Sequence, residues 1–92
     1  MPRNLPSLTS LLAFEAAARH LNFTAAGKEL HLTQTAISHQ IKNLEDHLAT
    51  RLFVRRNRAL VLTTAGQQYL ESVRDAIGLL QSATARTRDE KS

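Results

Sequence analysis

The sequence predicts a mainly α fold with three short helices, a small β-hairpin and one long final helix. Three observations support this fold class. Apolar residues recur every three or four positions over residues 8–21 and again over 33–48, as on helices packed against a core. The period stops in RLFVRRNRALVLTT (51–64), where two β-prone runs, LFV and LVL, flank a basic turn. It resumes as a heptad pattern over 64–86, which contains no Pro.

Composition restricts the possible classes of protein. A chain of 92 residues with 42% hydrophobic residues has the size of one domain with a modest core. It has no Cys, no pair of His at helical metal-site spacing and no glycine-rich phosphate loop, so we expect no enzyme, no metal and no cofactor. No segment resembles a signal peptide or a membrane span, so we expect a cytoplasmic chain. The formal charge of +4 and pI of about 10.4 favour a polyanionic partner.

The first helix is expected to begin after Ser7, which can cap it, and to end between His20 and Asn22. Its predicted core-facing stripe consists of Leu8, Leu11, Phe14, Ala18 and Leu21.

Asn22 or Thr24 can cap a short second helix, AAGKEL (25–30), and Thr33 can cap a third helix over 33–48. Only a tight turn fits between these two helices. They must therefore cross at a steep angle, which is the arrangement of a helix-turn-helix.

The third helix has two different faces. One is an apolar stripe of Ile37, Ile41, Leu44 and Leu48. The other carries hydrogen-bonding side chains where a solvated face usually has Glu and Lys, and these residues are Gln34, Thr35, Ser38, His39 and Lys42. A Gln amide can pair with adenine, a Thr methyl can contact the thymine methyl, and Ser, His and Lys can bond to bases or phosphates. We therefore predict a DNA-reading face, against the alternative of an ordinary solvated surface. Thr24 and Thr33 can also bond to phosphate, although capping alone would explain them.

The hairpin predicted over 51–62 reads as a small wing. Arg51 and the three expected tip residues Arg55, Arg56 and Arg58 place four of the chain's twelve Lys and Arg residues in eight positions. Such a concentration of charge is typical of contact with the DNA backbone or minor groove. A solvated turn is the alternative interpretation.

The last helix is expected to begin at Thr63 or Thr64, where Thr64 and Gln67 can form a capping box, and to run to Arg86. A helix of about 20 residues spans roughly 30 Å, so its far half should extend beyond the core. We therefore predict a homodimer through a seam of Tyr69, Val73, Ala76, Ile77, Leu80 and Ala83. The predicted organisation is a winged helix-turn-helix domain (1–63), a linker and dimerisation helix (64–86) and a polar tail (87–92).

From Leu8 to Leu80 the chain resembles the N-terminal DNA-binding region of the LysR-type transcriptional regulators. The resemblance is carried by FEAAARHLNFTAAGKELHLTQTAISHQIKNLEDHL and RLFVRRNRALVLTTAGQQYL, which contain the patterns L-x-x-[ST]-Q-x-[AP]-[IV]-S-x-Q-I-x-x-L-E, LF-x-R and LT-x-A-G. SHQIKNLED with RRNRALVLT is most similar to the branch that contains the glycine-cleavage activator and the chromosomal β-lactamase regulator.

The resemblance implies a bacterial, sequence-specific DNA-binding domain that binds an inverted-repeat operator as a dimer. The third helix would enter the major groove, the wing would lie on the backbone or minor groove, and the long helix would lead to an effector-binding domain that this chain lacks. Full-length members would be dimers or tetramers. Because chains of the family are considerably longer, we expect an isolated DNA-binding fragment or a truncated product.

Two positions depart from the family pattern. Ala49 stands where the family usually has Gly, and a left-handed Ala would cost on the order of 1 kcal/mol. His39 stands where many relatives have Arg, which removes a permanent charge from that position. The alternative function from another class is a helical dimerisation or adaptor module, in which the heptad seam is the functional surface and the basic wing only keeps the chain in solution.

Overall fold

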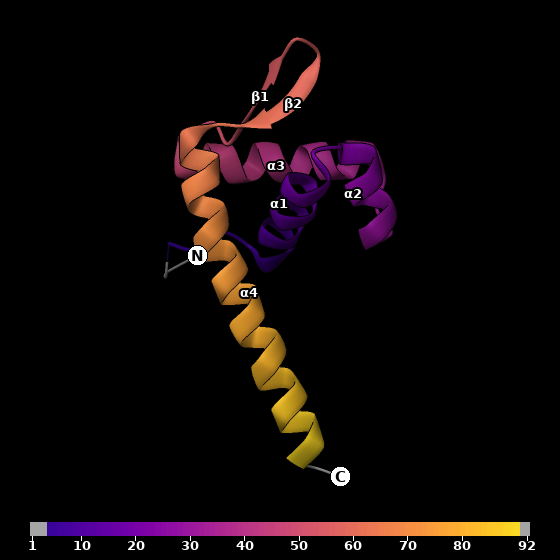
Figure 1. Ribbon diagram of the computed structural model, residues 1–92, viewed down its shortest axis with the longest axis vertical. Helices are drawn as coiled ribbons and strands as arrows, with labels where there is room; N and C mark the ends of the chain where they lie inside the picture. Colours follow the sequence, from indigo (N-terminus) through magenta and orange to yellow (C-terminus); the bar gives the residue numbers. More distant parts are fainter. Residues whose placement is uncertain (1–3, 91–92) are drawn as a thin grey trace.

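The computed structural model describes residues 4–90, and its elements follow the predicted order (Figure 1). They are α1 (Leu8–His20), α2 (Phe23–Leu30), α3 (Gln34–Leu48), β1 (Phe53–Arg56), β2 (Ala59–Leu62) and α4 (Thr64–Glu90). The prediction of a mainly α, winged helix-turn-helix fold is therefore confirmed. Residues 1–3 and 91–92, which belong to the predicted first domain and polar tail, lie outside the described residues.

The helix α1 begins and ends as predicted, and Leu11, Phe14 and Ala18 of the predicted stripe contribute to the core, but the two ends of the stripe do not. The Ser7 hydroxyl oxygen caps it by accepting a hydrogen bond from the Ser10 N–H at 3.1 Å. Leu8 and Leu21, assigned to the core-facing stripe, are 53% and 46% exposed. The fully buried positions include the alanines Ala13, Ala16 and Ala17. These small side chains let α2 and α3 approach α1 closely around the buried ring of Phe14.

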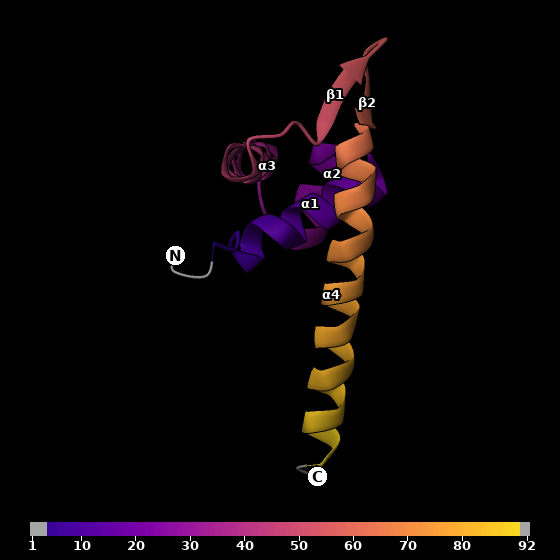
Figure 2. The same cartoon turned by 90° about the vertical axis from the view of Figure 1, so that its left-hand side faces the viewer.

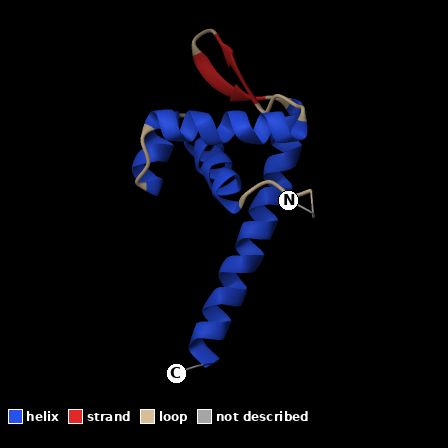
Figure 3. Cartoon of the chain, turned by 180° about the vertical axis from the view of Figure 1, so that it is seen from behind, coloured by secondary structure: helices blue, strands red, loops and turns tan. Residues whose placement is uncertain are grey.

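The helices α2 and α3 form the predicted helix-turn-helix. Asn22, not Thr24, caps α2, because its side-chain oxygen accepts from the Ala25 N–H at 2.9 Å. Thr33 caps α3 in the same way. Gly27 lies against the turn between them, and a Cβ there would overlap the carbonyl oxygen of Leu32. The steep crossing of α2 and α3 is seen in Figure 1 and, from behind, in Figure 3.

Each of the three short helices ends in a left-handed residue that is not glycine. These residues are Leu21, His31 and Ala49, with φ of 50°, 58° and 53°. Ala49 therefore has the left-handed conformation to which the expected cost applies. Among the described residues no glycine has a positive φ.

The wing is a two-stranded antiparallel hairpin in which Phe53 pairs with Leu62 and Arg56 with Ala59. Asn57 and Arg58 form its two-residue turn with φ of 51° and 67°, the signs that a type I′ turn requires. Arg55 and Arg56 lie in β1 and not at the tip, so the predicted tip was too long and only Arg58 of the three arginines lies in the turn. The hairpin projects from one end of the molecule (Figure 2).

Aromatic rings fix the base of the wing to the helical core. The ring centroid of Phe53 lies 5.6 Å from that of Phe14 and 5.6 Å from that of Phe23, both in edge-on geometry. Phe14 also contacts the ring of Tyr69 on α4 at 5.8 Å. One cluster therefore joins the first two helices, the wing and the last helix.

The helix α4 differs from the prediction in three ways. Thr63 caps it by accepting from the Gly66 N–H at 2.9 Å, so the predicted Thr64–Gln67 capping box is wrong. The helix continues past Arg86, and residues 87–90 of the predicted tail are helical. Val73, predicted in the dimer seam, is 4% exposed and belongs to the core of its own chain.

The far half of α4 extends well away from the three short helices (Figure 2), and the molecule measures 51 × 30 × 21 Å. Its exposed apolar side chains include Leu79 and Leu80. Within residues 4–90 no helix has both the length and the apolar character needed to cross a membrane.

Candidate nucleic-acid interface

The polar face predicted on α3 is exposed along its length. Its residues are Gln34, Thr35, Ser38, His39 and Lys42, all of which are solvent-exposed. On the opposite side Ile37, Ile41 and Leu44 are buried. The core thus fixes the orientation of α3, so its polar side chains are displayed from a rigid element.

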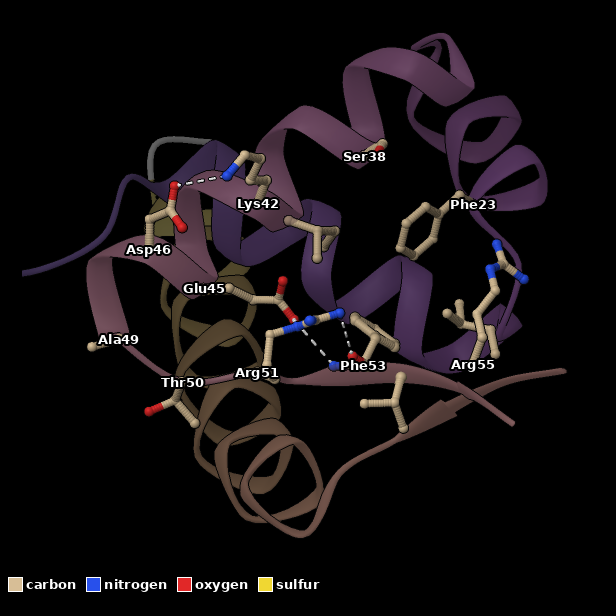
Figure 4. A pocket seen from close by; sticks show the side chains of 13 residues that line it. Phe23, Ser38, Lys42, Glu45, Asp46, Ala49, Thr50, Arg51, Phe53 and Arg55 are labelled. Carbon is tan, nitrogen blue, oxygen red and sulfur yellow. Dashed lines mark hydrogen bonds and ion pairs between the residues drawn. The ribbon is translucent and has the colours of Figure 1, made fainter. Parts of the chain in front are cut away.

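A groove of about 740 Å³ separates α3 from the wing (Figure 4). Ser38 and Lys42 line it from α3, and Arg51 and Arg55 line it from the segment that leads into the wing and from β1. Phe23 forms part of its wall. The groove therefore has hydrogen-bonding groups on the helix side and guanidinium groups on the wing side.

A second hollow of about 420 Å³ lies where α2 and α3 begin. Thr24 and Gln34 line it from the two helices, and Arg55 and Arg58 line it from the wing. Arg55 lines both hollows, which places them side by side on one surface. The structure thus brings six of the predicted contact residues together: Thr24, Gln34, Ser38, Lys42, Arg55 and Arg58.

Four other predicted contact residues lie outside the two hollows: Thr33, Thr35, His39 and Arg56. All four are exposed. The Thr33 hydroxyl already accepts the capping bond from the Ala36 N–H at 3.0 Å.

The acidic side chains on this surface are paired. The Lys42 Nζ lies 3.4 Å from an oxygen of Asp46. Within the described part of the chain, the side chains of Arg55, Arg56 and Arg58 form no hydrogen bond or ion pair. Their guanidinium groups are therefore free to bind an anion such as a DNA phosphate.

Glu45, which the sequence did not predict as a site residue, occupies the junction between α3 and the wing. Glu45 accepts hydrogen bonds from the backbone N–H groups of Leu52 and Phe53 at 2.8 and 3.2 Å. Its carboxylate also lies 3.6 Å from the Arg51 Nε, and Arg51 is itself exposed in the groove. One general rule could have pointed to this contact. Buried backbone N–H groups are rarely left unpaired, so the N–H groups that follow α3 need hydrogen-bond acceptors.

A separate ion cluster joins the C-terminal ends of α1 and α2. Arg19 bonds to Glu15 at 2.9 Å and to Glu29 at 2.6 Å, and His20 lies 2.7 Å from Glu29. Hydrogen bonds with Arg19 and then with His20 lower the pKa of Glu29 to about 2, and the hydrogen bonds that Arg19 donates to Glu15 and Glu29 raise the pKa of Arg19. The Tyr69 hydroxyl has its pKa raised by burial. No group of His, Cys, Asp or Glu within residues 4–90 could hold a metal ion.

A steeply crossed helix pair with an exposed polar second helix, beside a basic hairpin, defines a winged helix-turn-helix DNA-binding domain. The family model described as "Bacterial regulatory helix-turn-helix protein, lysR family" matches residues 8–67. The chain belongs to this family of transcription regulators, and the prediction that it is no enzyme is confirmed by that membership.

Relatives and solved structures agree with this assignment. The glycine cleavage system transcriptional activator of Escherichia coli strain K12 is 51% identical over 94% of this chain and 28% of its own length. The HTH-type transcriptional activator AmpR of Citrobacter freundii is 45% identical over 99% of this chain and 33% of its own length. The present chain thus spans about a third or less of these curated relatives.

Two solved structures with the same fold contain DNA. The DNA complex of the CbnR DNA-binding domain has a TM-score of 0.80, with 34% identity over 94% of this chain and 99% of that one. The complex of the BenM DNA-binding domain with benA site 1 DNA has a TM-score of 0.85, with 27% identity over 94% and 97% of the two chains. The chain is therefore a LysR-family DNA-binding domain.

Proposed function

We propose that this domain reads a specific duplex DNA site with α3 in the major groove and with the 51–62 wing on the backbone or minor groove. The observation that best supports this proposal is that Arg55 of the wing lines both of the hollows that α2 and α3 border. The helix and the wing therefore present one continuous surface to a single ligand. DNA fits this surface because it offers base edges and phosphates within the same groove.

The two groups of residues would have separate roles. Gln34, Thr35 and Ser38 lie in the first turns of α3, the end that a helix-turn-helix directs at base edges. His39 and Lys42 lie farther along the helix and would bond to phosphate or guanine. The three wing arginines and Arg51 would neutralise phosphates, while Thr24 and Thr33 would bond to the backbone beside their places in the turn.

We further propose that two chains associate through α4 and bind an inverted repeat. The far half of this helix exposes apolar residues that the chain's own core does not cover: Ala76, Leu79 and Leu80. A symmetric pair would place the two copies of α3 about one DNA turn apart, or a small multiple of it. Because the relatives are much longer, the whole protein would carry an effector-binding domain after α4, would form a dimer or tetramer and would act in the cytoplasm.

The experiment compares base-reading variants with a wing variant on duplexes of different sequence. Gln34→Ala or Ser38→Ala should remove discrimination at one or two base pairs, about 1–3 kcal/mol for each good contact, and leave nonspecific binding nearly unchanged. The Arg55→Ala, Arg56→Ala, Arg58→Ala triple variant should weaken binding to every sequence. Its slope of log K against log salt should fall by about 0.9 for each phosphate that the variant no longer neutralises.

A wild-type salt slope in the triple variant would contradict the assignment of the wing. A wild type that shows no salt-dependent binding to duplex DNA would contradict the proposed function itself and favour an adaptor built on α4. Selection of bound duplexes from a random pool would identify the operator.

A further inference from the structure

The connection between α3 and the wing depends on one side chain. Glu45 lies in the last turns of α3, and Figure 4 shows it pointing across the groove toward Arg51 and Phe53. A single carboxylate oxygen, Oε2, accepts from two successive backbone amides, those of Leu52 and Phe53. The Glu45 side chain is only 13% exposed. It is therefore a polar group held in place between two elements.

These two amides define where the wing begins. Leu52 and Phe53 are buried, and Phe53 opens β1 by pairing with Leu62. The Leu52 carbonyl accepts from the Thr63 N–H at 2.9 Å, which closes the hairpin at its base. Because an unpaired buried N–H is costly, the position of Leu52 and Phe53 depends on an acceptor at the place where Glu45 supplies it.

The wing has no other extensive contact with α3. The β2 strand packs on α4, and the aromatic contacts of Phe53 are with α1 and α2. Together with these aromatic contacts, the segment that Glu45 holds therefore sets the separation between the polar face of α3 and Arg55. A carboxylate on a DNA-facing surface would by charge alone oppose binding.

We propose that Glu45 is a positioning residue for DNA recognition, one that sets the distance between α3 and the wing so that both reach the same duplex. This inference rests on the proposed function, in which Ser38 and Lys42 act beside Arg55. The role depends on the reach of an acceptor oxygen and not on its charge, since one oxygen takes both bonds.

The test separates reach from charge at the same position. Glu45→Asp keeps the charge but is shorter by one methylene group, so it should lose the hydrogen bonds from both amides. Glu45→Gln loses the charge but keeps an oxygen at the same reach. Asp46→Asn is the matched control, because it removes one carboxylate charge from the exposed neighbouring position on the same helix.

We expect Glu45→Asp to bind every duplex more weakly, with the slope of log K against log salt lower by about 0.9 for each phosphate that the wing no longer reaches. We expect Glu45→Gln and Asp46→Asn to keep the wild-type slope and to bind at least as tightly as wild type. In an Arg55→Ala background, Glu45→Asp should have a smaller effect, because the guanidinium group that it would misplace is already absent.

Two outcomes would overturn the role of Glu45. One is a Glu45→Asp variant that binds DNA as wild type does. The other is a salt slope that is reduced in Glu45→Gln but not in Asp46→Asn. Measurements are made where each variant retains the wild-type circular dichroism spectrum. Should Glu45→Asp not fold, the comparison of Glu45→Gln with Asp46→Asn still decides. A wild type without salt-dependent DNA binding contradicts the proposed function, whereas a binding wild type with a normal Glu45→Asp contradicts only this inference.

Discussion

Ala49 shows how far one backbone angle can determine the effect of a substitution. With φ of 53° it caps α3 in the left-handed region, where a Cβ meets the neighbouring backbone. Ala49→Gly should therefore raise the free energy of unfolding by up to about 1 kcal/mol. Chemical denaturation measures the change. Ala49→Val is the control at the same site and should lower stability, because a β-branched residue fits this region worst. Destabilisation by Gly would contradict this interpretation.

At the residue scale the sequence predicts types of contact better than it predicts geometry. The exposure of the five polar residues on α3 followed from their spacing, because Ile37, Ile41 and Leu44 mark the buried side. Neither the spacing nor the composition could place Glu45 against Leu52 and Phe53. That contact depends on how the chain turns after α3, and residues seven and eight positions away are not neighbours on any single element.

At the scale of elements, two glycines should respond to alanine in opposite directions. A Cβ on Gly27 would overlap the backbone oxygen of Leu32, which cannot move without opening the turn between α2 and α3. Gly27→Ala should therefore cost about 1–3 kcal/mol of stability. Gly78 has no atom near its Cβ position, so Gly78→Ala should gain about 0.5–1 kcal/mol from helix propensity. Thermal unfolding of both variants tests this, and a shift of the same sign would contradict it.

The link between α1 and α2 should make stability depend on acid pH. The pKa of Glu29 is about 2 in the folded chain and 4.5 as its ordinary value, so its ionised form is favoured by folding. The contribution of Glu29 is fully present above pH 4.5 and is lost as the pH falls toward 2. Glu29→Gln should therefore lose less stability than wild type over this range. Parallel curves of melting temperature against pH for the two proteins would contradict the prediction.

The order and type of every element followed from the sequence, whereas its packing partners did not. The heptad pattern in α4 correctly grouped Tyr69, Val73 and Ile77 on one side, because 3.5 is close to the helical period. A pattern of spacing does not say what covers that side. The first half turned out to pack on α1, which buries Val73 and leaves only the later residues for a partner. Leu8 and Leu21 of α1 were wrongly predicted to face the core for a related reason. The alanines of α1 allow the neighbouring helices to approach more closely than the leucines would.

At the scale of the whole molecule, α4 should decide the stoichiometry on DNA. Leu80 is 55% exposed, and burying one Leu contributes about 1.5–3 kcal/mol, counted twice in a symmetric pair. Leu80→Glu should therefore cost several kcal/mol of association and leave the headpiece folded. Sedimentation with an inverted-repeat duplex should give two wild-type chains per duplex and mostly one variant chain.

The control for this change adds the same charge elsewhere on α4. Ser82 lies two residues from Leu80 and so faces nearly the opposite way around the helix. Ser82→Glu should retain two chains per duplex. Equal stoichiometry for wild type and Leu80→Glu would show that this side of α4 is not the contact between chains.

The left-handed ends of the three short helices also bear on how readily this domain could acquire a new target. Leu21, His31 and Ala49 each have a strained conformation that glycine would adopt freely. Substitution by glycine could therefore raise the free energy of unfolding at positions outside the base-reading turns of α3. Most substitutions that alter recognition destabilise a fold to some degree. The substitutions His31→Gly and Ala49→Gly would offset such losses of stability before the recognition residues are changed. A lineage or a designer could then vary Gln34 and Ser38 more widely before the domain ceased to fold.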